Sequence, residues 1–98
     1  MSESTVIELD MGLSEKDFGD VLTNAVNPYV IKNTPSGYAL ENEQQQKITI
    51  EKTILPPRVI ASFKLPRMMV VLTLHGHSET EVEAFMKRFN RYMHRGGG

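Results

Sequence analysis

Hydrophobic and polar residues alternate at the start of the chain. In residues 5–11, TVIELDM, every second residue is apolar: Ile7, Leu9 and Met11. A period of two is typical of a strand with one buried face, and Gly12 follows directly. This segment is therefore predicted to be a half-buried strand that ends at Gly12.

The next segment has the spacing of an amphipathic helix. Ser14 is suited to an N-cap, Asp17 follows three residues later, and Asn27-Pro28 provides a stop. The apolar positions between these signals recur at i, i+3, i+4 and i+7: Phe18, Val21, Leu22 and Ala25. A helix with one apolar stripe is predicted here.

The last segment, residues 78–95, gives the strongest helix signal. Ser78 and Glu81 have the spacing of a capping box, and basic residues gather toward the C-terminal end, where the helix dipole favours cations. Its apolar stripe consists of Val82, Phe85, Met86, Phe89 and Met93. We expect the glycines at 96–98 to end this helix and to form a disordered tail.

The chain between the two helices has the pattern of strands. Pro35-Ser36-Gly37 predicts a hairpin turn between residues 29–33 and 38–40. From Lys47 onward the pattern indicates three strands, separated by turns at Pro56-Pro57 and at residues 65–67, because proline cannot donate to a strand ladder. Short connections favour antiparallel pairing throughout.

These elements predict an α+β fold in one domain, residues 1–95. Two amphipathic helices bury their stripes most simply on one face of an antiparallel sheet of four to six strands, which gives a two-layer sandwich in the order β-α-β-β-β-β-α, with room for an extra short strand. This order is similar to one repeat of the TATA-binding-protein-like architecture. The resemblance concerns topology and carries no sequence motif or function.

Composition narrows the classes of function. The 98 residues include eleven Lys and Arg against twelve Asp and Glu, so no overall positive field attracts nucleic acid or anionic membrane. Without cysteine there is no disulfide, thiol catalysis or thiolate metal site. No signal peptide or membrane span is visible, and we expect a soluble cytoplasmic protein. No cofactor motif or Ser-His-acid signature is present, so an enzymatic activity has little support and no cofactor is predicted.

His75-Gly76-His77 is the segment nearest to a chemical motif. His75 and His77 could share a metal ion if Glu79, Glu81 or His94 supplied a further ligand. Two imidazoles are too few for a stable site, and the glutamates are already explained by capping and by the helix dipole. We favour a strand-to-helix junction and keep the metal site as an alternative.

The sheet face turned away from the helices is the preferred binding surface. If the even-numbered residues of 68–74 face the helices, Met69, Val71, Thr73 and His75 point outward. On the preceding strand the same alternation sends Ile60, Ser62 and Lys64 outward, and Val59, Ala61 and Phe63 inward. An apolar patch with polar surroundings predicts contact with a protein partner, self-association as a homodimer, or a small ligand. The predicted site comprises Ile60, Met69, Val71, Thr73 and His75.

The basic end of the last helix offers an alternative surface. Basic side chains interleaved with Tyr92 can mark a site for nucleic acid. The candidate residues are Lys87, Arg88, Arg91 and Arg95. A solvated face that complements the helix dipole explains the same residues.

Overall fold

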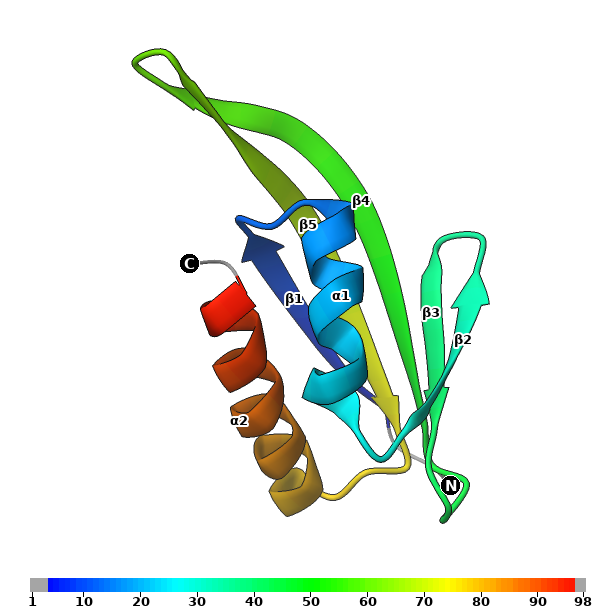
Figure 1. Cartoon of the computed structure of the whole chain (residues 1–98). Helices are drawn as coiled ribbons and strands as arrows, with labels where there is room; N and C mark the ends of the chain where they lie inside the picture. Colours follow the sequence, from blue (N-terminus) through cyan, green and yellow to red (C-terminus); the bar gives the residue numbers. More distant parts are fainter. Residues whose placement is uncertain (1–3, 97–98) are drawn as a thin grey trace.

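A computed structural model describes residues 4–96, and the final glycines of the predicted tail, 97–98, lie outside the described residues. Seven elements follow one another in the chain (Figure 1): β1 Ser4–Met11, α1 Glu15–Val26, β2 Val30–Thr34, β3 Gly37–Glu41, β4 Lys47–Ile60, β5 Phe63–His75 and α2 Glu79–Gly96. Gly96 belongs to α2, so this helix extends one residue beyond the predicted boundary.

The five strands form one antiparallel sheet in the order β1-β5-β4-β3-β2. Both helices lie on the same face of this sheet and leave the other face uncovered (Figure 1). The predicted α+β two-layer sandwich, with its order β-α-β-β-β-β-α, is confirmed. We call the uncovered side the outer face.

The core lies between β5 and the two helices. Along β5 the residues Met68, Val70, Leu72 and Leu74 are fully buried and the residues between them are half-buried, as the alternation predicts. Phe18 of α1 and Phe89 of α2 are also fully buried, and their rings meet edge to face with centroids 6.2 Å apart. The apolar stripes of both helices therefore meet over β5.

Both predicted helix caps are formed. The Ser14 hydroxyl accepts a hydrogen bond from the Asp17 amide at 3.2 Å. At the second helix the Ser78 amide donates to the Glu81 carboxylate at 2.8 Å, and the Glu81 amide donates back to the Ser78 hydroxyl at 3.2 Å. This reciprocal pair satisfies two amides that the helix itself leaves without a partner.

The prediction of turns at the prolines was wrong. β4 runs through Pro56-Pro57 and β5 runs through Pro66, and the turn lies at Ala61-Ser62 instead. Pairing of β3 with β4 ends at Glu51, and pairing of β1 with β5 ends at Met68. Beyond these points each strand has a free edge, and a bulge between Leu55 and Arg58 accommodates the double proline. Proline is tolerated there because no third strand needs its missing N–H.

Residues 55–67 form a two-stranded hairpin that we call the arm. It projects from the body of the molecule (Figure 1), whose principal extents are 49 × 23 × 22 Å. Within the arm β4 and β5 pair only with each other, from Leu55 with Arg67 to Ile60 with Phe63.

Candidate functional site

The outer face carries four of the five residues predicted to bind a partner. Met69, Val71, Thr73 and His75 alternate with the buried residues of β5 and are half-buried between the flanking strands. They lie in one line along the uncovered face, between β1 and β4. Their role in binding stays a prediction.

The fifth residue, Ile60, lies at the far end of the arm. It pairs with Phe63, whereas Met69 pairs with Thr53. Phe63 and Met69 are six residues apart on one strand, or roughly 20 Å. The structure therefore does not place Ile60 next to the other four residues.

The side assigned to Phe63 was also wrong. Because β5 is one continuous strand, its alternation places Phe63 and Leu65 on the same side as Met69. Directly paired residues share a side, so Ile60 belongs with Phe63, while Val59 and Lys64 lie on the opposite side. The outer face thus continues along the arm.

Large hydrophobic side chains are exposed along the arm. Phe63 is 69% exposed, more than any other large hydrophobic residue described. The remaining exposed residues of this kind on the arm are Val59 at 62%, Ile60 at 53% and Leu65 at 44%. Sequence reasoning missed Phe63 and Leu65 as candidates, although the segment around them, RVIASFKL, is rich in apolar residues and contains no acidic residue.

Charge is divided unevenly between the arm and the rest of the molecule. The arm holds three of the eleven Lys and Arg residues, namely Arg58, Lys64 and Arg67, and none of the twelve Asp and Glu residues. On the outer face of the body, Glu8 and Glu51 lie on either side of Val71. Among residues 4–96 neither of these glutamates forms an ion pair, and Arg58 forms none either.

One ion pair fixes the base of the arm. The Arg67 guanidinium donates to both carboxylate oxygens of Asp10, with Nε 3.0 and 3.1 Å from Oδ1 and Oδ2. These hydrogen bonds lower the pKa of Asp10 below its ordinary value of 3.8, and the nearby charge of Arg58 acts in the same direction. The end of β1 is therefore bound to the last residue of the arm, where β5 enters the body.

The outer face contains a hollow of about 500 Å3 over β2, β3 and β4. Its lining includes small side chains of β3 and β4 and the charged side chains around them: Val30, Lys32, Ala39, Glu41, Lys47 and Thr49. We call it the outer-face hollow. Its small floor residues, Ala39 and Thr49, leave room for an apolar side chain.

The two histidines have separate structural roles. His77 is buried, and its Nδ1 lies 3.0 Å from the carbonyl oxygen of His75. Since a carbonyl only accepts, Nδ1 donates to it, which leaves Nε2 to accept from the Tyr29 hydroxyl at 2.8 Å. His75 is on the outer face, where its Nδ1 lies 3.1 Å from the Ser4 hydroxyl oxygen. With both ring nitrogens engaged, His77 has no nitrogen left for a metal ion.

The metal alternative gains no further ligand from neighbouring residues. Within residues 4–96, no three His, Asp or Glu side chains come close enough together to hold a metal ion. Glu81 is instead bound by the Ser78 amide and by the side-chain amide of Gln46, at 3.1 and 3.2 Å, and these bonds lower its pKa. It acts as a capping residue.

One of the four basic candidate residues of α2 is held against α1. Arg88 donates to the carbonyl oxygen of Asn24 in α1 at 3.0 Å and lies over the ring of Tyr92. Lys87 and Arg91 are exposed, and the side chain of Arg95 lies outside the part of the chain that the structure describes. Nucleic-acid binding by this helix stays a prediction.

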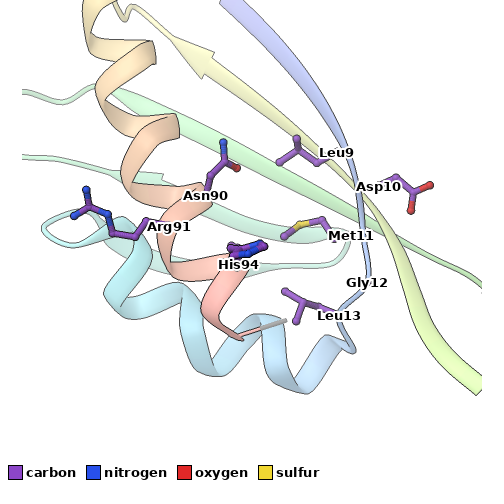
Figure 2. A pocket seen from close by; sticks show the side chains of 9 residues that line it. Leu9, Asp10, Met11, Gly12, Leu13, Asn90, Arg91 and His94 are labelled. Carbon is purple, nitrogen blue, oxygen red and sulfur yellow. The ribbon is translucent and has the colours of Figure 1, made fainter. Parts of the chain in front are cut away.

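A second groove lies between the end of β1 and the last turns of α2. It has a volume of about 710 Å3, and Figure 2 shows Leu9, Met11 and Leu13 on one side and Asn90, Arg91 and His94 on the other. The groove offers apolar contacts beside one guanidinium and one imidazole. It includes none of the predicted partner-binding residues.

Comparison with known proteins gave no match: no family model, no curated protein and no solved structure matches the chain. Neither of the two described helices is long and apolar enough to cross a membrane.

Proposed function

We propose that the chain is a cytoplasmic protein-binding module, which contacts its partner through the arm and the outer face. The observation that carries this proposal is the exposure of Val59, Ile60, Phe63 and Leu65 within the arm. Their burial against a partner would gain roughly 25 cal/mol per Å2 of apolar surface. The folded chain itself gains nothing from leaving them in water.

A scattered apolar surface residue needs no functional explanation, but this group differs in two respects. The four side chains lie within seven consecutive sequence positions, and they project on a hairpin whose edges are unpaired. Contiguous apolar surface with polar surroundings marks interaction sites in monomeric proteins. The arm presents it away from the body, where a partner can reach both sides.

A protein partner fits this surface better than nucleic acid does. Phosphate binding depends on several cations that are free to pair with the backbone. Of the three cations on the arm, Arg67 already binds Asp10, and Glu8 and Glu51 lie on the adjoining outer face. These carboxylates repel phosphate and attract a basic protein surface.

Site-specific photocrosslinking in the full chain tests the proposal. A photoreactive phenylalanine replaces Phe63 in one variant and Lys16, which is exposed on α1, in a matched control. We expect defined protein adducts in cells from position 63 and none of the same mass from position 16. Equal adducts at both positions, no adducts, or nuclease-sensitive adducts at position 63 would overturn the proposal.

A further inference from the structure

We propose that the partner is a second copy of this chain, with the two outer faces packed together and antiparallel. In this homodimer each arm lies along the outer face of the other body. The inference rests on the proposed function and adds the identity of the partner. Its basis is that the arm and the body are complementary in charge and in shape.

Charge complementarity supports self-association. The arm has three cations and no acid, which leaves the rest of the chain with eight cationic side chains against twelve acidic ones. Arg58 shares the outer side of the arm with Leu65, and Glu51 shares the outer face of the body with Val71. All three of Arg58, Glu51 and Glu8 are exposed, and none is paired within the described chain.

The ladder register specifies which residues meet. The two-fold axis lies between the two outer faces and crosses β5 at right angles between Arg67 and Met69. Rotation about this axis reverses the strand direction and places β4 over β4 and β5 over β5 of the second copy. Positions 65 and 71 of β5 then coincide, and their β4 partners are Arg58 and Glu51. Arg58 of each copy therefore faces Glu51 of the other. Such an isologous contact is made twice.

The end of the arm is matched by the same operation. Position 63 of β5 coincides with position 73, and the corresponding β4 residues are Ile60 and Thr49. Thr49 lines the outer-face hollow, so Ile60 of one copy enters the hollow of the other while Phe63 covers Thr73. A hollow of about 500 Å3 accommodates an isoleucine side chain readily.

The overlap extends along much of both strands. From Phe63 to Thr73 the ladder spans ten residue steps, or about 33 Å. No like charges coincide along this overlap, since Arg67 falls over Met69 and Leu55 over Thr53.

A charge-swap experiment with the full chain tests the arrangement. Analytical ultracentrifugation compares the unmodified chain with Arg58→Glu, with Glu51→Arg and with an equimolar mixture of the two variants. We expect a dimer for the unmodified chain and a Kd at least tenfold higher for each single variant, because like charges then face each other twice. The mixture restores affinity, since its heterodimer has one native and one reversed pair.

Two further measurements separate this arrangement from other dimers. Arg91→Glu, on α2 away from the outer face, should leave the Kd unchanged. Because the chain has no cysteine, Ile60→Cys and Thr49→Cys can be mixed and oxidised, and we expect a disulfide-linked heterodimer that neither variant forms in equal yield alone. Circular dichroism verifies that each variant is folded.

The outcomes distinguish this inference from the proposed function. A chain that sediments as a monomer at all concentrations, or a dimer that neither charge variant weakens, overturns self-association through the outer face. If position 63 still forms defined adducts with another protein in cells, the proposed protein-binding function is retained although self-association is rejected. A failed rescue in the mixture, together with absence of the 60–49 disulfide, rejects the antiparallel register.

Discussion

Arg67 binds both carboxylate oxygens of Asp10. This contact connects the end of β1, where its pairing with β5 stops, to the base of the arm. Because the folded pKa of Asp10 lies below its ordinary value of 3.8, the carboxylate stabilises the fold above that value. This contribution is lost as the pH falls through the lowered folded pKa.

The acid dependence of this pair can be measured through Asp10→Asn. We expect the unmodified chain to melt at a higher temperature than Asp10→Asn at pH 7, and the two melting temperatures to converge as the pH falls from about 4 toward 2. Thermal unfolding followed by circular dichroism across this range gives both values. Asp20→Asn is the matched control, because its ion pair with Lys16 is more exposed and should matter less. A constant difference from pH 7 to pH 2 would contradict the assignment.

Substitution of two phenylalanines should distinguish a loss of stability from a loss of association. Phe89 is fully buried in the core, whereas Phe63 is 69% exposed on the arm. We expect Phe89→Ala to lower the free energy of unfolding by about 3–5 kcal/mol. Phe63→Ala should change it by less than about 0.5 kcal/mol and should weaken association instead. Urea denaturation and sedimentation of both variants test this contrast, and a large loss of stability in Phe63→Ala would show that the arm packs against its own body.

The hydrogen bond between Tyr29 and His77 joins the residue directly before β2 to the junction before α2. We expect Tyr29→Phe to lower the free energy of unfolding by about 1 kcal/mol at neutral pH, because the buried His77 Nε2 loses its donor. The same variant should leave the Nδ1 proton in place, which 15N-edited NMR of the imidazole detects. A shift of the proton to Nε2 in the unmodified chain would contradict the assigned tautomer.

Alkaline pH gives a second readout of Tyr29. Burial raises its pKa above the ordinary value of 10.0, and the negative charge of Glu81 adds to this effect. A raised folded pKa means that the contribution to stability is present below the unfolded value and is lost as the pH rises through the folded one. Between pH 9 and pH 11 the unmodified chain should therefore lose more stability than Tyr29→Phe, as measured by thermal unfolding. Parallel losses in the two proteins would exclude this role.

The sequence was sufficient for those features that depend on local pattern. The caps at Ser14 and Ser78 and the alternation along residues 68–74 follow from short-range rules, and all three were predicted. The prediction of turns at the prolines was wrong because proline interrupts a strand only where a third strand needs its N–H as a donor. That neighbour is set by where β1 and β3 end, which no local window reveals.

The candidate site was predicted only in part for a related reason. Alternation identified Met69 and its neighbours on β5, but the location of Ile60 depended on the assumed turn at residues 65–67. Because β4 and β5 are continuous in the structure, Ile60 lies at the end of the arm and Phe63 lies on the side opposite to the predicted one. His77 likewise found its partner in Tyr29, 48 positions away in the sequence. Such long-range pairings are set by the topology.

Removal of the arm tests whether binding and folding are separable in the whole chain. Leu55 and Arg67 are paired, so a two-residue Asn-Gly turn can replace residues 56–66 and retain the bond between Arg67 and Asp10. Residues 56–66 are exposed and contribute little to the core. We therefore expect the melting temperature to change by no more than a few degrees. Self-association and crosslinking of the outer face should both disappear, because the shortened chain lacks Ile60, Phe63 and Arg58. Loss of cooperative unfolding would instead show that the body needs the arm to fold, and a shortened chain that still forms the same dimer would show that the arm does not carry the contact.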